Sequence, residues 1–168
     1  DGQEIYPKDI ISFICLSDYN EMYLGLEEHG VAKVDLVAGT VTRLRLSDNP
    51  DAPLFVRHIL PYSPDELWIG TESGIVVYNI RTRRYQHLKS SPYDPYSLSD
   101  NAVYSLCKDR EGGLWIGSYF GGINYLPQRN SDFEKYEVID GVRVRCGNET
   151  KNWCGPINAG VTLVWKLF

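Results

Sequence analysis

Several features that mark common protein classes are missing from this chain of 168 residues. No apolar run approaches the ~20 residues that a membrane-spanning helix needs. The net charge of −5 comes with no basic stripe that could neutralise nucleic-acid phosphates. The one basic cluster, residues 81–84, is typical of a solvated turn. Composition therefore argues against a membrane segment in this chain and against a nucleic-acid partner.

Methionine is also scarce. Met22 is the only one, and the chain starts at Asp1. We therefore expect a processed protein or a part of a longer product, from which a targeting segment could have been removed. The sequence itself leaves the compartment open.

Cysteine and histidine are few, and their spacing does not suit a metal. The four cysteines form no C-x-x-C pair and the three histidines no H-x-x-x-H pair. Cys15, Cys107 and Cys146 align with one another and, in the second copy of a repeat described below, with Ile59. This pattern predicts an inward-facing position and buried free thiols. No serine or cysteine has a nucleophile motif around it, so we predict no catalytic residue, no metal and no cofactor.

One motif recurs four times along the chain. It reads LWIGSYFGGI at 114–123, LWIGTESGI at 67–75, MYLGLEEHGV at 22–31 and, in degraded form, WCGPINAGV at 153–161. The first glycines of the copies lie 45, 47 and 38 residues apart, a period typical of propeller blades or solenoid repeats. The second glycine supplies the positive φ of a hairpin turn. Each copy therefore predicts a strand, a tight turn and a second strand.

The whole chain is predicted to be all-β, a single partial β-propeller domain over residues 1–168. Four antiparallel strands in about 45 residues make one blade, and the repeats are expected at about 10–46, 54–88, 102–138 and 142–168. No fourth strand is left in the last repeat, which gives about three and a half blades. Closed propellers need roughly four to eight. We therefore expect either part of a longer product or self-association, such as a homodimer formed through the open edges.

These residues resemble a known family, the two-component regulator propeller repeat. The resemblance is carried by Leu-Trp-Ile-Gly at 114–117, by Leu-Ser-Asp-Asn-x-Val at 98–103 and by Asp-x-x-Gly at 109–112. It is good over residues 54–126, moderate over 10–46 and poor over 142–163.

The resemblance implies a function. Propellers of this family are similar to periplasmic sensor regions of hybrid two-component systems, mostly from gut Bacteroidetes, which typically detect breakdown products of polysaccharides. It implies a periplasmic, non-enzymatic sensor module for an oligosaccharide. A full-length member would also carry a second propeller, a β-sandwich, a membrane helix, a histidine kinase and a regulator. None of these is in this chain, so the resemblance implies a fragment or truncated relative, with any kinase activity in the further parts.

One face of the predicted blades gathers the candidate binding residues. In a four-stranded blade, the turn between strands two and three lies on the same face as the connector to the next blade. Aromatic rings flanked by carboxylates and amides on that face suit a sugar. The candidates are His29, Glu72, Tyr93, Tyr96, Tyr119, Phe120 and Asn158. The Tyr119–Phe120 pair is the most informative, because the second copy has Glu72–Ser73 there; packing against an adjoining blade or subunit is the alternative explanation.

Two other functions remain open at the level of sequence. A protein-interaction scaffold would bind a polypeptide through the open edge of the propeller. A propeller lyase or hydrolase would need a metal or an acid–base pair converging on one face.

Overall fold

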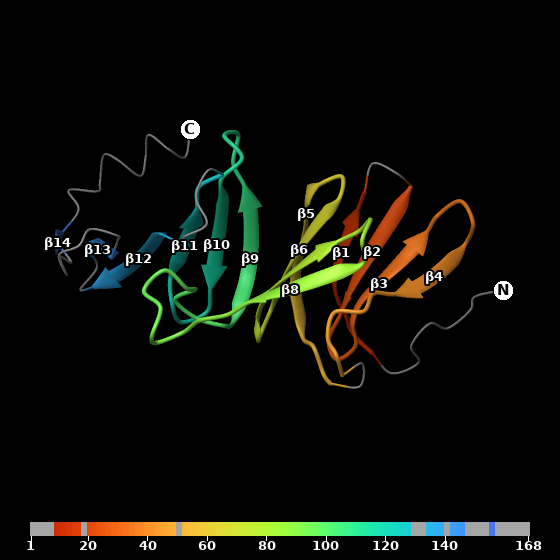
Figure 1. Ribbon diagram of the computed structural model, residues 1–168, viewed down its shortest axis with the longest axis horizontal. Helices are drawn as coiled ribbons and strands as arrows, with labels where there is room; N and C mark the ends of the chain where they lie inside the picture. Colours follow the sequence, from red (N-terminus) through yellow and green to blue (C-terminus); the bar gives the residue numbers. More distant parts are fainter. Residues whose placement is uncertain are drawn as a thin grey trace.

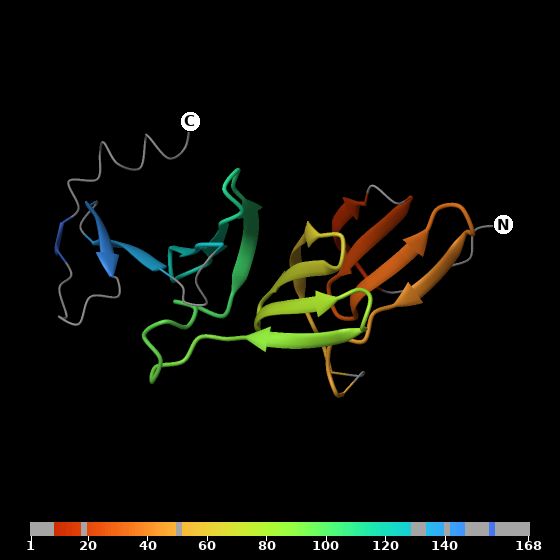
Figure 2. The same ribbon diagram turned by 45° about the horizontal axis from the view of Figure 1, so that its top comes forward.

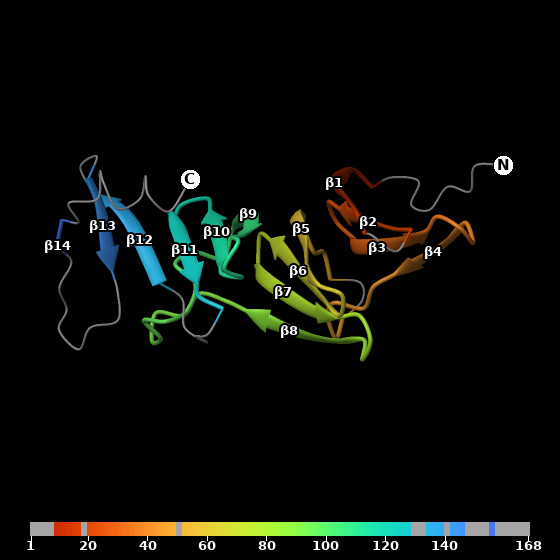
Figure 3. The same cartoon turned by 90° about the horizontal axis from the view of Figure 1, so that it is seen from above.

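The computed structural model describes residues 9–17, 20–49 and 52–128 in full, and the backbone of strands at 134–139, 142–146 and 155–156 (Figure 1). Every regular element among these residues is a strand, and the strands form three antiparallel sheets that follow one another along the chain. Seen from above, the sheets stand side by side like successive blades (Figure 3). The all-β propeller prediction is confirmed.

The first sheet has the order β1-β2-β3-β4. Its strands are β1 (Ile11–Leu16), β2 (Glu21–Leu26), β3 (Gly30–Asp35) and β4 (Thr40–Arg43). Gly30 ends the turn between β2 and β3 with a φ of 73°, in the left-handed region that glycine enters without a steric cost. The carboxylate of Asp35 accepts the backbone N–H groups of Val37 and Ala38 at 2.9 and 2.8 Å, and so holds the next turn.

The second sheet repeats this order with β5 (Val56–Ser63), β6 (Glu66–Thr71), β7 (Gly74–Asn79) and β8 (Arg84–Leu88). The Thr71 hydroxyl accepts the N–H of Ser73 at 3.0 Å and donates to the Gly74 carbonyl at 2.8 Å. Gly74 has a φ of 110°, and a Cβ there would collide with the backbone carbonyl of Leu88. Only glycine fits this turn. The connector that follows β8 then crosses to the inner strand of the third sheet (Figure 2).

The third sheet begins with β9 (Val103–Lys108), β10 (Leu114–Ser118) and β11 (Ile123–Leu126). Asp109 shapes the turn before β10. Its Oδ1 accepts the N–H groups of Glu111 and Gly113 at 3.0 and 2.7 Å, and its Oδ2 accepts Trp115 Nε1 at 3.2 Å. The Asp-x-x-Gly segment is therefore a side-chain-stabilised turn.

The fourth expected repeat, 142–168, remains a prediction. In the structure β12 (Glu134–Ile139), β13 (Val142–Cys146) and β14 (Gly155–Pro156) continue the third sheet in the order β11-β12-β13-β14. Thus β13 pairs with β12 and does not open a sheet of its own. Residues 157–168, where a further strand was expected, lie outside the described residues.

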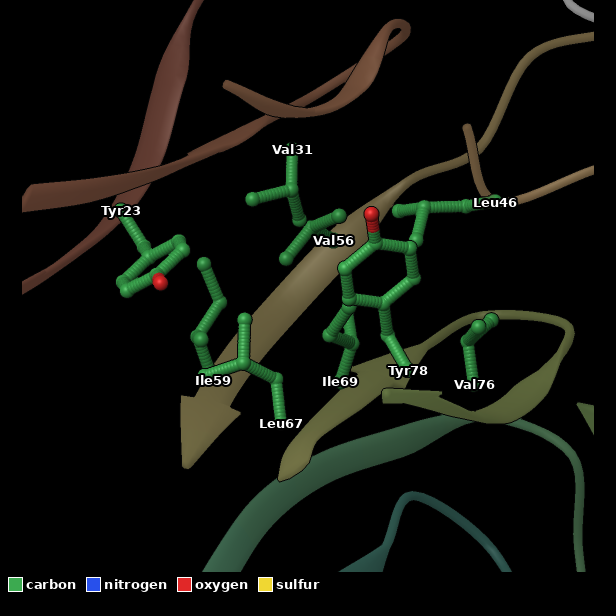
Figure 4. Packing of buried hydrophobic residues seen from close by; sticks show 9 residues of the cluster. All are labelled: Tyr23, Val31, Leu46, Val56, Ile59, Leu67, Ile69, Val76 and Tyr78. Carbon is green, nitrogen blue, oxygen red and sulfur yellow. The ribbon is translucent and has the colours of Figure 1, made fainter. Parts of the chain in front are cut away.

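The core lies between the blades. We call the side of a blade that faces the preceding blade its leading face, and the opposite side its trailing face. Tyr23 and Val31 on the trailing face of blade one pack against Val56, Ile59 and Ile69 on the leading face of blade two (Figure 4). A second cluster repeats this arrangement one blade later. It joins the trailing face of blade two to the leading face of blade three and includes Trp68, Ile75, Val103, Leu106 and Ile116.

A valine placed against a glycine recurs at both junctions. A Cβ on Gly25 would lie 2.7 Å from Cγ1 of Val56, and a Cβ on Gly70 would lie 3.0 Å from Cγ1 of Val103. Both valines are fully buried. The first glycine of the first two motifs therefore makes room for the inner strand of the next blade.

The cysteines occupy a position different from the one expected. Cys15 and Cys107 each pair with the aromatic residue of the motif, and in the second sheet the residue in that place is Leu60, not Ile59. Cys15 is half-buried against the core, and burial raises the pKa of its thiol. Cys107 is exposed, so the prediction of a buried thiol is wrong there. The side chain of Cys146 lies outside the described residues.

Candidate ligand-binding face

The turns between the second and third strands meet the connectors on one face of the blades. The Leu54 N–H donates to the Glu28 carbonyl at 2.9 Å, and the Gly74 N–H donates to the Asn101 carbonyl at 2.7 Å. We call this the connector face; it comprises turns 27–29, 72–73 and 119–121 with connectors 44–54 and 89–102. The placement expected from the sequence is confirmed.

One hydrogen bond recurs in all three blades and makes these turns equivalent. The N–H groups of residues 27, 72 and 119 donate to the carbonyls of residues 10, 55 and 102, at 2.9, 3.2 and 2.9 Å. Tyr119 therefore stands where the first two blades have Glu27 and Glu72. An acidic position has been replaced by an aromatic one without any change in the backbone contact.

Three exposed aromatic rings gather at this place. Tyr104 and Tyr119 have ring centroids 5.3 Å apart, and Tyr119 and Phe120 stand edge to face at 4.5 Å. Their exposed fractions are 41%, 62% and 85%. We call these three residues the aromatic cluster. Exposed aromatic surface is unfavourable in water, so a continuous group of this kind indicates a contact surface.

An ion-paired strip of side chains adjoins the aromatic cluster. Arg57 forms a charge-assisted pair with Glu72 and lies 3.7 Å from Glu27. The Tyr104 hydroxyl donates to Glu72 Oε1 at 3.3 Å, and the Arg57 guanidinium lies over the Tyr104 ring at 5.3 Å from its centroid. The hydrogen bond to Glu72 raises the pKa of Arg57 despite the opposing effect of burial. The strip thus presents fixed donors and acceptors beside apolar rings.

A β-bulge in the inner strand of a blade positions Arg57 in the second blade and Tyr104 in the third. The pairing register shifts between Ile11 and Phe13 and again between Val56 and His58, and β9 shows the same irregularity opposite Gly117 and Ser118. The skipped residues are Ser12, Arg57 and Tyr104. A bulge redirects the side chain of its extra residue, so this repeat position can vary without loss of the core.

Residues 97–120 match the family described as two component regulator propeller. The match covers the end of the connector, β9, β10 and the turn that carries Tyr119 and Phe120. This segment of the chain therefore carries a copy of the two component regulator propeller repeat. In this repeat the Asp109 turn and Gly117 belong to the scaffold, whereas the turn after Ser118 differs among the three blades.

The relatives of this repeat protein are much longer than the chain. Histidine kinase P4 of Formosa agariphila is 36% identical over 73 residues, which make up 43% of this chain and 5% of that protein. Two solved structures share the fold, the extracellular domains of the B. thetaiotaomicron proteins BT3049 and BT4673, which are assigned as hybrid two component systems. Each is 17% identical, with TM-scores of 0.58 and 0.63. They cover 81% and 88% of this chain, which spans 19% and 21% of theirs.

Of the sequence-predicted residues, the structure brings Glu72, Tyr119 and Phe120 together, with Tyr104 as the link. Arg57 and Tyr104 were not predicted. Both could have been found by aligning the three inner strands on the apolar residues Ile11, Val56 and Val103, because the residue that follows changes from Ser12 to Arg57 to Tyr104.

His29 is held by a buried carboxylate. Asp9, whose side chain is 1% exposed, accepts His29 Nδ1 at 2.6 Å and the backbone N–H groups of Glu27 and His29 at 3.1 Å each. Burial raises the pKa of Asp9, but the bonds from His29 and the backbone outweigh it and leave the pKa lowered. His29 also lines a groove of about 430 Å³ with Arg43, Leu46 and other residues of the following connector.

Tyr93 and Tyr96 lie on the second connector, outside the aromatic cluster. Their exposed fractions are 95% and 38%, and the Asp94 carboxylate accepts the backbone N–H of Tyr96 at 2.9 Å. Among the described residues, no ring contact joins either tyrosine to Tyr119. Asn158 lies outside the described residues.

Two further observations concern the described part of the chain. Those residues include no group of three or more His, Cys, Asp or Glu side chains that could hold a metal ion. They also include no helix long and apolar enough to cross a membrane.

Proposed function

We propose that this chain is the ligand-binding part of a two component sensor and that its aromatic cluster binds a carbohydrate-derived ligand. The regulator propeller repeat supports the sensor role. The observation that carries the ligand class is the exposed group Tyr104, Tyr119 and Phe120 beside the Arg57–Glu72 pair.

The chemistry of the surface fits a sugar. A pyranose ring has an apolar face that stacks on an aromatic ring, and its rim carries hydroxyl groups that both donate and accept hydrogen bonds. The aromatic cluster offers the stacking surface, and Glu72 and Arg57 offer an acceptor and donors whose positions their mutual pairing already fixes. Such pre-organised polar groups raise affinity because little conformational freedom is lost on binding.

Binding without turnover and an extracytoplasmic location complete the proposal. The similar solved structures are extracellular domains of two component systems, which favours a periplasmic site for this chain. The ion pair beside the aromatic cluster also favours binding, because Arg57 already engages the Glu72 carboxylate.

Calorimetric titration with a panel of oligosaccharide fragments tests the proposal. We expect one class of fragment to bind the chain, and Tyr119→Ala or Phe120→Ala to weaken that binding by about tenfold, equivalent to about 1.4 kcal/mol. Tyr93→Ala is the matched control, because this tyrosine is even more exposed and lies outside the aromatic cluster. Failure of every fragment to bind, or hydrolysis of the fragment during titration, would refute the proposal.

A scaffold that binds another polypeptide is a second candidate function. It is favoured by one specific observation, the exposed apolar inner strand of blade one.

A further inference from the structure

A groove of about 580 Å³ lies between the outer strands of blades one and two, and its lining is basic. Among the described residues, four basic side chains line it against one acidic side chain, that of Asp35. The four are Lys33, Arg43, Arg45 and Arg83. The chain as a whole carries a net charge of −5, so positive charge is concentrated in this groove against the overall balance.

Strand pairing places the polar lining from blade one on the side that faces blade two. Lys33 lies opposite both Tyr23 and Thr42, and Asp35 lies opposite Thr40. Residues directly opposite one another in an antiparallel pair share a face of the sheet, and Tyr23 packs against blade two in the core. The hydroxyl groups of Thr40 and Thr42 therefore lie on the same face as Lys33.

Two buried tyrosines, Tyr23 and Tyr78, line the groove on its core side, and both belong to the cluster in Figure 4. Burial raises the pKa of Tyr78, while the charges of Arg83 and Lys33 act on it in the opposite direction. Lys33 comes from blade one and Arg83 from blade two. Cations from the two blades therefore converge near the same tyrosine ring.

Arg83 is held at the groove in a backbone conformation that an arginine rarely adopts. Its φ is 55°, and Gly39 occupies the equivalent place in the turn between β3 and β4 with a φ of 66°. The two turns are built alike, because Asp35 and Asn79 each end a third strand and accept turn N–H groups through Oδ1. Blade two thus has an arginine where the turn favours glycine, and backbone outliers of this kind cluster at functional sites.

Fold stability does not account for these cations. At the next junction, the positions equivalent to Lys33 and Arg43 are occupied by Val77 and His87, so the packing of blades does not require a cation at either place. Arg83 forms no salt bridge within the described part of the chain. The basic lining is a feature of this one groove and indicates a ligand of opposite charge.

We propose that the groove binds a small hydroxylated molecule that carries a carboxylate, sulfate or phosphate group. Arg83 and Arg43 hold the oxyanion, which guanidinium groups bind through paired N–H donors, and the threonine hydroxyls bond the hydroxyl groups of the ligand. A volume of about 580 Å³ lies within the range of about 300–1,000 Å³ that is typical of small-molecule sites. The proposal does not depend on sugar binding at the aromatic cluster, which lies at the turns on the opposite ends of the strands.

Calorimetric titration with three probes tests the ligand class. Glucuronate carries a carboxylate on a hydroxylated ring, glucose is its neutral counterpart, and inorganic sulfate is an oxyanion without the ring. We expect glucuronate to bind, sulfate to bind more weakly and glucose not to bind at this groove, with the affinity for both anions falling as salt is added. Absence of binding by both anions would overturn the proposal, and sulfate binding as tight as glucuronate would overturn the role of the threonine hydroxyls.

Three variants test the place of binding. Arg83→Gly should weaken glucuronate binding at least about tenfold while the chain stays folded, because glycine adopts this φ without a steric cost. Lys33→Val installs the residue type of the next junction and should also weaken binding. Arg81→Gly is the matched control, because Arg81 lies in the same turn but is absent from the groove lining and pairs with Asp65. An unchanged affinity in Arg83→Gly, or an equal loss in Arg81→Gly, would overturn the proposal.

Discussion

The packing of Val56 on Gly25 predicts a stability effect that can be worked out from the structure. A methyl group added by Gly25→Ala would lie 2.7 Å from Cγ1 of Val56 and 3.1 Å from Cβ of Phe13. Val56 is fully buried and cannot move away into solvent. Overpacking of this kind costs about 1–3 kcal/mol. Val56→Ala alone removes two methyl groups, which contribute about 1.6 kcal/mol at about 0.8 kcal/mol for each carbon, and it also leaves a cavity.

The double variant should be more stable than the sum of the two changes predicts. The added methyl at residue 25 occupies space that Val56 Cγ1 has vacated, so we expect a favourable coupling of about 1–2 kcal/mol. Urea unfolding followed by tryptophan fluorescence gives each free energy of unfolding by linear extrapolation. Gly25→Ala combined with Val103→Ala is the control and should be additive, because Val103 packs on Gly70 one blade away. Additivity in the Gly25–Val56 pair itself would refute the packing rule on which the blade equivalence depends.

Three further predictions follow from buried polar groups. The pKa of Asp9 is lowered in the folded chain, so the stability that Asp9 contributes is present above its unfolded pKa of 3.8 and is lost as the pH falls through the folded pKa. Asp9→Asn should therefore reduce the loss of stability at acidic pH, measured by urea unfolding at a series of pH values. Burial lowers the pKa of His58 from 6.5. The contribution of neutral His58 to stability is therefore complete above pH 6.5 and decreases as the pH falls. His58→Gln should remove this pH dependence of the melting temperature, followed by circular dichroism. Asn124 is fully buried; its Oδ1 accepts the Ser99 N–H at 3.0 Å and its Nδ2 donates to the Ser99 hydroxyl at 2.8 Å. Asn124→Ala should lower the free energy of unfolding by about 1–3 kcal/mol and speed proteolysis of connector 89–102. Unchanged cleavage would count against a role of Asn124 in holding this connector.

Much of the fold follows from the sequence because the repeat carries it. The motif copies at 67–75 and 114–123 were predicted to form a strand, a tight turn and a second strand, and the structure places β6 with β7 and β10 with β11 there. The cysteine position was misaligned because the second copy was aligned on Phe55, whereas Val56 is the residue equivalent to Ile11 and Val103. The face was misassigned because a bulge follows that residue in each inner strand and shifts the alternation of faces by one residue. A period-two pattern contains no signal for such an inserted residue, so Cys107 was assigned to the wrong environment.

The candidate site was predictable only where it departs from the repeat. Tyr119 and Phe120 stand out because the second blade has Glu72 and Ser73 in the same turn. The partner of His29 could not be predicted, since Asp9 lies 20 residues away in the segment before the first strand. That contact depends on how the chain enters blade one, and no repeat position specifies it.

A carbohydrate-derived ligand that binds on the aromatic cluster must contact its tyrosine rings, so observing those rings tests binding at this place directly. Protein labelled with carbon-13 in its tyrosine rings is titrated with the oligosaccharide that binds most tightly in calorimetry, and the ring resonances are assigned by single tyrosine-to-phenylalanine substitutions. We expect the resonances of Tyr104 and Tyr119 to shift together along one binding curve, while those of Tyr93 do not move. Shifts confined to Tyr93 or Tyr96, or no shift in any tyrosine under saturating ligand, would contradict it.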